Sequence, residues 1–258
     1  MDKKIIIFDI DGTLYDNKNK CLYESSIECI KTLYEKGHEL VIASGRSFPM
    51  ISNIDKIKKY INTYILINGQ IILRNGIEIY KEAIELNKLK KLLDDFNEYD
   101  IPYGCISSSL ERLSKINQDV NHAYTSFCLK EPVVDEDYYL KDDIYQIWCF
   151  GDNDKIKDFI IQHPDYDFMP WGGTGYDVVP KGRNKARTIK KLIEILGYEM
   201  KDVIALGDGY NDISMINTVG FGIAMGNACD ELKEVADYIT DDIDKDGVYK
   251  VFKYLNMI

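Results

Sequence analysis

Short apolar runs alternate with amphipathic stretches along both ends of the chain. Several of the runs show no alternation between apolar and polar positions, which predicts strands buried on both faces. These runs are residues 5–8, 39–43, 64–67, 203–206 and 222–225, with a shorter one at 238–240. The stretches between them place apolar residues at helical spacing, which predicts helices at 24–36, 49–59, 185–196, 231–236 and 247–254. Strands that alternate with helices are typical of a parallel sheet, so the pattern predicts an α/β core.

The middle of the chain has a different pattern. Asn75-Gly76 between two alternating runs predicts a β-hairpin. Beyond it, helices are expected at 83–97 and 154–162 and strands at 101–106, 144–150, 166–171 and 176–179, whereas 107–141 fits only loosely as helix and loop. We interpret 82–181 as an α+β domain inserted into a core made of 1–81 and 182–258.

Local signals mark the start of the first helix and the segment before it. Ser25 or Ser26 is expected to cap that helix, and Gly37 is expected to end it. The polar stretch 16–20 is expected to be a loop.

Polar side chains follow several of the buried strands directly. They are Asp9 and Asp11, then Ser44, then Asp208 with Asn211 and Asp212. Ligands of open α/β sheets bind beyond the carboxyl ends of the strands. Because Asp9 and Asp11 are two residues apart, both carboxylates can face one small volume, where a divalent cation such as magnesium would offset their repulsion. An acidic turn without function is the alternative for this pair taken alone.

Composition limits the possible partners. The chain has 258 residues, 45% of them hydrophobic and 29% charged, and a formal net charge of -11. That charge argues against a nucleic-acid partner and against an anionic membrane surface. No apolar run is long enough for a signal peptide or a membrane span. The six cysteines have no zinc-site spacing and suggest reduced thiols in a cytoplasmic protein; they are Cys21, Cys29, Cys105, Cys128, Cys149 and Cys229.

Four motifs together resemble those of the haloacid dehalogenase superfamily, in particular the Cof-type phosphatases with a type IIB α/β cap. They are Asp9-Ile10-Asp11-Gly12-Thr13, Ala43-Ser44-Gly45-Arg46, Lys185, and Gly207-Asp208-Gly209-Tyr210-Asn211-Asp212. The resemblance extends over nearly the whole chain and includes the segment from Met225-Gly226-Asn227-Ala228 to Gly247. It implies a Rossmann-like core and a cap that closes over the active site and selects the leaving group.

The resemblance also implies a mechanism. Asp9 would attack phosphorus and form an aspartyl-phosphate, and Asp11 would act as general acid and then as general base. Lys185 would neutralise the charge that develops. Phosphate and substrate would be held by Ser44, Gly45, Arg46, Lys185 and Asn211. Magnesium would be bound by Asp9, the Asp11 backbone carbonyl and Asp208, with Asp212 as a further ligand directly or through water. Asn211 and Asp212 would alternatively orient the metal waters or Lys185.

Several of these assignments have alternatives in the sequence. Ser44 could be a helix N-cap, and Arg46 could form a salt bridge instead of contacting phosphate. Lys185 could be a solvated helix lysine; Ala186 follows it where glycine is common in the family, and Lys190 is the fallback. A small phosphorylated metabolite, with sugar phosphates first, is the expected substrate. A phosphomutase and a non-catalytic phospho-aspartate signalling protein are the competing functions, and the oligomeric state stays open.

Overall fold

The computed structural model describes residues 3–127 and 129–258, so Cys128 lies outside the described residues. The chain divides into two compact units. The first consists of Met1–Arg46, Met50–Lys81 and Asn184–Ile258, and the second of Ser47–Pro49 and Glu82–Arg183.

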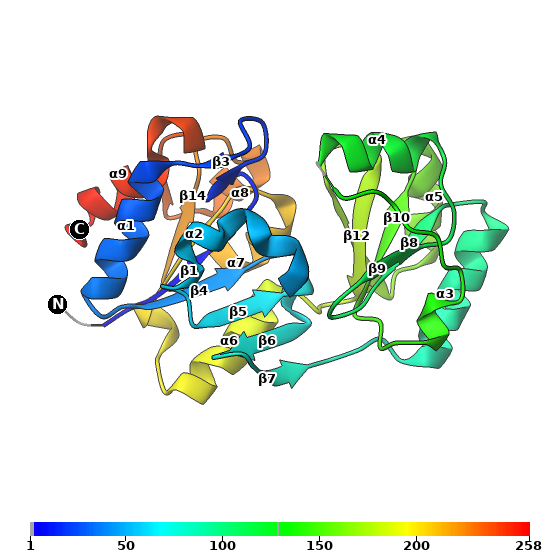
Figure 1. Ribbon diagram of the computed structural model, residues 1–258, viewed down its shortest axis with the longest axis horizontal. Helices are drawn as coiled ribbons and strands as arrows, with labels where there is room; N and C mark the ends of the chain where they lie inside the picture. The colour runs from blue at the N-terminus through cyan, green and yellow to red at the C-terminus, as the bar shows by residue number, and fades with distance from the viewer. Residues whose placement is uncertain (1–2, 128) are drawn as a thin grey trace. The chain divides into compact units, whose positions relative to one another are not determined.

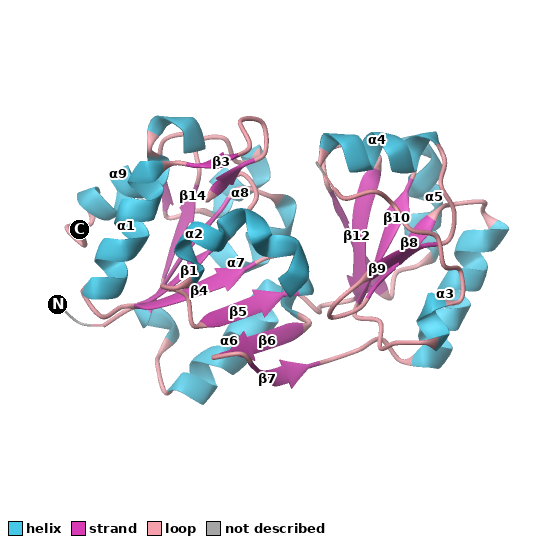
Figure 2. Ribbon diagram, in the orientation of Figure 1, coloured by secondary structure: helices cyan, strands magenta, loops and turns pink. Residues whose placement is uncertain are grey.

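An eight-stranded sheet forms the centre of the first unit (Figures 1 and 2). Its order is β15 (Tyr238–Ile239), β14 (Phe221–Ala224), β13 (Val203–Gly207), β1 (Ile5–Phe8), β4 (Glu39–Ala43), β5 (Thr63–Leu66), β6 (Ile71–Arg74) and β7 (Ile77–Lys81). The strands from β15 to β5 are parallel, and β6 and β7 are antiparallel. The strand β1 therefore lies inside the parallel part, between β13 and β4.

Helices cover both faces of this sheet. One face packs against α6 (Lys185–Leu196), α7 (Ile213–Ile216) and α8 (Asp230–Val235), and the other against α1 (Glu24–Glu35) and α9 (Gly247–Tyr254). Successive side chains of β1 point to opposite faces: Ile7 joins the core with Ile189, whereas the Phe8 ring lies 5.8 Å from that of Phe252. Two covered faces explain why the strand has no polar position, and the predicted α/β class is confirmed.

The second unit is an antiparallel sheet with helices on both faces. Its strand order is β11 (Tyr166–Pro170), β12 (Gly175–Pro180), β10 (Gln146–Phe150), β8 (Tyr103–Ile106) and β9 (Glu111–Leu113). On one face, Ile147 of β10 lies in the apolar cluster with α3 (Leu86–Glu98) and α5 (Asn153–Gln162). On the other, Trp148 makes an edge contact with Tyr124 of α4 (Gln118–Ser126).

Two local expectations near the first helix differ from the structure. Tyr23 is the N-cap of α1 and makes no side-chain cap bond, so the expected capping by Ser25 or Ser26 is wrong, and both serines lie inside the helix. The expected loop at 16–20 is the turn of a small hairpin, in which β2 (Tyr15–Asp16) pairs with β3 (Cys21–Leu22).

Other element boundaries also differ. The helix expected at 49–59 is a 3-10 segment, Phe48–Ile54, followed by the short α2 (Asp55–Lys58). The weakly patterned segment 107–141 contains β9 as well as a helix and loops. The strand expected at 64–67 ends at Leu66, because the backbone of Ile67 turns into the left-handed region with φ 52°.

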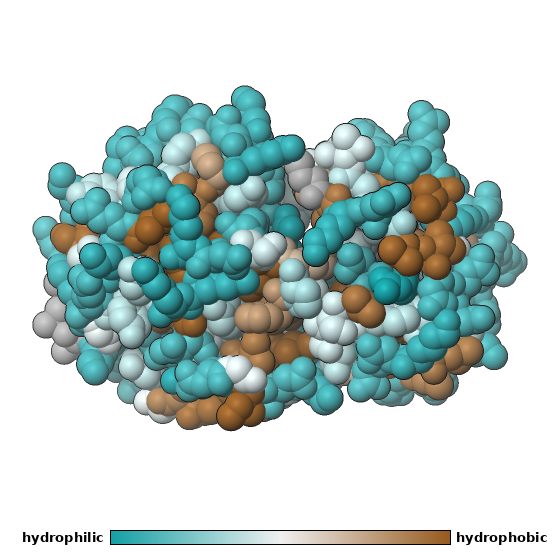
Figure 3. Space-filling model, in the orientation of Figure 1, coloured by the Kyte–Doolittle hydropathy of each residue, from teal (hydrophilic) through white to brown (hydrophobic). Residues whose placement is uncertain are grey.

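Hydrophilic side chains cover most of the face of the molecule in Figure 3, and hydrophobic ones lie there in separate patches. Within the part of the chain that the structure describes, every helix is too short or too polar to cross a lipid bilayer.

Candidate active site

The site lies where β1 and β13 end. The amide of Asp9 donates to the Leu206 carbonyl at 3.0 Å, which ties the end of β1 to its neighbour. Gly12 then turns the chain with φ 77°, and a Cβ on it would lie 2.0 Å from Oδ2 of Asp208. Only glycine combines this backbone angle with so close an approach, so the first and fourth motifs pack directly against each other.

Lys185, the first residue of α6, is the buried cation of the site. Its side chain is fully buried, and Nζ donates to Oδ1 of Asp9 at 2.7 Å and to Oδ1 of Asp212 at 2.6 Å. Asn184 caps the helix through its side chain, which accepts from the Arg187 amide at 3.0 Å. Lys190 is exposed. The structure therefore places Lys185, and not Lys190, among the acidic residues.

Burial and like charge shape the electrostatics of this cluster. Burial, and then the neighbouring Asp212 carboxylate, raises the pKa of Asp9 from 3.8 to about 7, against the opposing effect of Lys185. Burial and the Asp9 carboxylate raise the pKa of Asp208 well above its ordinary value. Burial alone would lower the pKa of Lys185, but the carboxylates of Asp212 and Asp9 more than offset it, so that pKa is raised.

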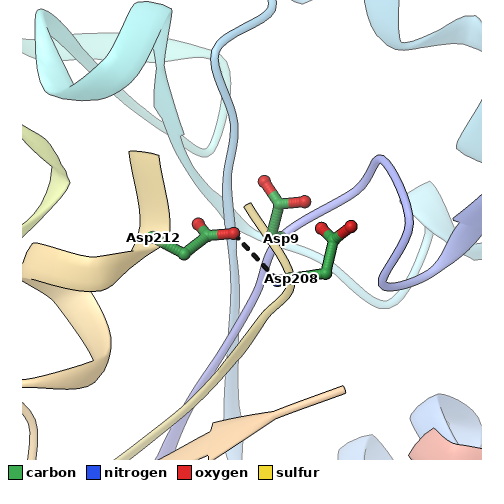
Figure 4. Close-up of side chains that lie close together, drawn as sticks. All are labelled: Asp9, Asp208 and Asp212. Atoms are coloured by element: carbon green, nitrogen blue, oxygen red, sulfur yellow. Dashed lines mark hydrogen bonds between the residues drawn. The ribbon is translucent and has the colours of Figure 1, made fainter. Parts of the chain in front are cut away.

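Three carboxylates of the site converge, as Figure 4 shows. Asp9, Asp208 and Asp212 each offer an oxygen within 4.8 Å of the others. One ammonium cannot balance three carboxylates, and oxygen donors in this number suit a hard divalent cation. The chemistry of the donors therefore fits a metal.

The oxygens of Asp212 are already engaged within the protein. Oδ1 accepts from Lys185, and Oδ2 accepts from the amides of Asp208 and Gly209, both at 3.1 Å. The bond to the Asp208 amide is the dashed line in Figure 4. Asp9 and Asp208 thus have more free acceptor capacity toward a metal than Asp212, whose contacts position Lys185 and the loop after β13.

The carboxylate of Asp11 is not part of this group of three. It forms a two-point ion pair with Arg46, in which Nε donates to Oδ2 at 2.7 Å and Nη2 to Oδ1 at 2.6 Å. Asn17 donates to the same Oδ1 at 2.9 Å. Of the two possibilities for Arg46, this structure contains the salt bridge.

The second motif forms the loop that follows β4. Ser44 is buried, and its Oγ accepts from the Arg46 amide at 3.1 Å across the half-buried Gly45. No helix begins at Ser44, because the next helical segment starts at Phe48. The hydroxyl therefore braces the Ser44–Arg46 loop, and the helix-cap alternative does not apply.

Three asparagines contact residues of the predicted motifs, and these asparagines were not predicted from the sequence as part of the site. Asn17 contacts Asp11, and Asn68 accepts from Nδ2 of Asn211 at 2.9 Å. Asn227 donates to the Gly12 carbonyl at 2.9 Å. Asn68 follows a buried strand, as Ser44 does, so its position at the strand end is a signal that could have identified it. Asn17 lies in a polar stretch with no such signal.

The fold and the site define a class of protein: an α/β enzyme with a buried carboxylate and ammonium cluster at the carboxyl edge of a parallel sheet. Comparison with known proteins agrees with this class. Residues 6–252 match the model of the haloacid dehalogenase-like hydrolase family. The chain belongs to this family.

Individual relatives match along nearly their full length. The chain is 35% identical to "Putative phosphatase YkrA" of Bacillus subtilis, with all of both chains covered. It is 26% identical to the 5-amino-6-(5-phospho-D-ribitylamino)uracil phosphatase YcsE of Bacillus subtilis, over 98% of this chain and 96% of the relative. The structure of the subclass IIB sugar phosphatase BT4131 is similar with a TM-score of 0.91 and 28% identity, over 99% of this chain and 100% of the other. These matches confirm the predicted family and the predicted class of enzyme, a phosphatase.

Proposed function

We propose that this protein is a magnesium-dependent phosphatase that hydrolyses a small phosphorylated metabolite through an aspartyl-phosphate on Asp9. The observation that carries the proposal is the cluster in which Lys185 contacts both Asp9 and Asp212 beside Asp208. Asp9 lies at the end of a buried strand that is paired on both sides, which suits a nucleophile that must be held in place.

The other residues have complementary roles in this proposal. Lys185 holds the Asp9 carboxylate in position and balances the negative charge of the phosphoryl group. Asp11 donates a proton to the leaving oxygen and then accepts one from the attacking water. Ser44, Gly45 and Asn211 hold the phosphate oxygens, and Arg46 joins them by exchanging its ion pair with Asp11 for a phosphate oxygen.

Magnesium would be held by Asp9, Asp208 and the Asp11 backbone carbonyl, with Asp212 assisting. When bound, it supplies positive charge that lowers the repulsion between the Asp9 carboxylate and an anionic ester. The sheet edge is otherwise strongly acidic, so a phosphate ester would be repelled without such a cation.

We propose the substrate class from the relatives and the location from the cysteines. A sugar phosphate is the first candidate, because a sugar phosphatase and a phosphatase of a phosphoribityl compound are among the relatives. We propose that the inserted unit, Glu82–Arg183, selects the substrate. The described cysteines are all free thiols, which agrees with a cytoplasmic location.

The test is phosphate release from p-nitrophenyl phosphate and a panel of sugar phosphates and other phosphorylated metabolites, with magnesium and with chelator. The Asp9→Asn variant should lose at least a thousandfold in kcat, because the amide is a poor nucleophile. The matched control is Asp202→Asn. Asp202 pairs with Lys4 at 2.7 Å, at the opposite ends of the same two strands, so this variant should keep its activity.

The outcomes separate the candidate functions. Metal-dependent release of inorganic phosphate that Asp9→Asn abolishes supports the proposal. An isomerised phosphate ester as product would instead show a phosphomutase. A stable phospho-aspartate without turnover would show a signalling protein.

A further inference from the structure

A buried turn of unusual backbone conformation directly follows β5. Three successive residues have positive φ: Ile67 at 52°, Asn68 at 50° and Gly69 at 96°. The left-handed region is unfavourable for residues with a Cβ, and most of all for a β-branched one such as Ile67. Ile67 is fully buried and Asn68 is 1% exposed, so the surrounding contacts must hold the turn in this form.

The backbone of the turn is bonded to the Ser44–Arg46 loop at both ends of that loop. The Asn68 amide donates to the Ser44 carbonyl at 3.0 Å, and the Ile67 amide donates to the Arg46 carbonyl at 3.1 Å. The left-handed conformation thus belongs to the arrangement that fixes the loop proposed to bind phosphate.

The turn also contacts the start of α6, where Lys185 lies. The carbonyl of Gly69 accepts from Oγ1 of Thr188 at 2.5 Å. A Cβ on Gly69 would lie 2.6 Å from the carbonyl oxygen of Asn184, so only glycine permits this approach. Since Asn184 and Thr188 flank Lys185 on the first turn of the helix, the contact sets the position of that turn.

A third contact is made by the side chain of Asn68. Its Oδ1 accepts from Nδ2 of Asn211, in the loop after β13, at 2.9 Å. One buried turn of three residues therefore contacts the loop of the second motif, the helix of the third and the loop of the fourth.

We infer that Asn68 is a positioning residue: its side-chain amide orients Asn211, from a turn that holds three site segments in register. The effect on catalysis rests on the proposed phosphatase function, whereas the contact itself does not. Backbone conformations of this kind persist where the surrounding structure enforces them, and they concentrate at functional sites. Partners that orient site residues commonly contribute 10- to 100-fold to activity.

Two substitutions separate the effect of the side-chain amide of Asn68 from the effect of its backbone conformation. Asn68→Ala removes the amide and keeps the unfavourable φ, whereas Asn68→Gly removes the amide and relieves it. Both should lower kcat/KM for p-nitrophenyl phosphate about tenfold or more, and Asn68→Gly should be the more stable of the two in urea. The matched control is Asn75→Ala, at an exposed hairpin position with the same φ of 50°, which should keep kcat/KM within twofold.

A double variant tests whether Asn68 acts through Asn211. Asn68→Gly combined with Asn211→Ala should be no less active than Asn211→Ala alone, because the contact is already absent. A further tenfold loss in the double variant would overturn the inference, as would an Asn68→Gly protein with activity within twofold of the parent.

The contact can be tested without any activity. The side-chain amide signal of Asn211 in a nitrogen–proton NMR spectrum, assigned by its loss in Asn211→Ala, should shift in Asn68→Gly and stay in place in Asn75→Ala. An unchanged signal in Asn68→Gly would overturn the inference even in an active enzyme. Absence of phosphate release by the parent protein would instead refute the proposed function.

Discussion

At the scale of single residues, the environment of Lys185 is set by residues far away in the sequence. A lysine near the start of a helix is commonly solvated, and the sequence favours Lys185 over Lys190 only because Lys190 lies more than a helical turn further into the helix. The structure buries Lys185 completely between Asp9 and Asp212. Each charge of this trio is tolerable in a buried site only because the others are present.

Replacement of Lys185 by methionine should therefore damage stability as well as activity. Loss of one partner from a buried ion pair leaves uncompensated charge and typically costs about 3 kcal/mol or more. We expect a loss of that order in the free energy of unfolding at pH 7.5 in chelator, measured by urea denaturation, and a loss of kcat of at least a hundredfold. Lys190→Met is the matched control on the exposed face of the same helix and should change neither by much. Equal urea midpoints for the two variants would contradict this account.

At the scale of secondary-structure elements, the sequence predicts an element well when the element's own residues determine its conformation. The strand Ile5–Phe8 is predictable because both of its faces are buried, which removes every polar position. The polar residues at its carboxyl end are then placed by the general rule for parallel sheets. The roles of these residues in catalysis stay predictions.

Other features are determined by contacts with residues that are distant in the sequence. The three-residue β9 is short and contains two charged residues, so it forms by pairing with β8 and not by its own pattern. Nor does a local pattern predict a left-handed isoleucine, since the contacts of Ile67 come from the Ser44–Arg46 loop. The ion pair of Asp11 with Arg46 joins residues 35 apart in the sequence, so no local pattern predicts that these two residues pair.

The N-cap of α6 offers a test at this scale. Asn184→Ala removes the bond to the Arg187 amide and should cost about 1 kcal/mol of stability in urea denaturation. Because Lys185 is the next residue, kcat should also fall severalfold. The matched control is Asn117→Ala in the other unit, where the same type of cap bonds the Val120 amide at 2.9 Å. It should cost a similar amount of stability and leave kcat unchanged; equal effects on kcat would refute the link between cap and site.

At the scale of the whole molecule, the active-site acids couple folding to pH and to metal. The folded-state pKa of Asp9 is about 7, against an ordinary value of 3.8, and that of Asp208 is raised as well. Between pH 4 and 7 the folded protein therefore holds protons that the unfolded chain has lost. Stability from these groups must fall as pH rises through this window in the absence of metal. The lowered pKa of His38 has the opposite effect on the pH dependence of stability. The contribution of Asp9 must therefore be measured as the difference in stability between a variant and the parent protein.

The Asp9→Asn variant provides that difference. Its side chain stays neutral, so in chelator its free energy of unfolding relative to the parent should improve by roughly 2–4 kcal/mol between pH 4.5 and 7.5. Urea denaturation at several pH values measures this directly. Magnesium should cancel most of the gain by stabilising the parent at pH 7.5, because a divalent cation then neutralises the cluster in place of protons. A difference that is independent of pH, or a parent that magnesium does not stabilise, would show that Asp9 is already balanced by Lys185, and the need for a metal at this site would lose its physical basis.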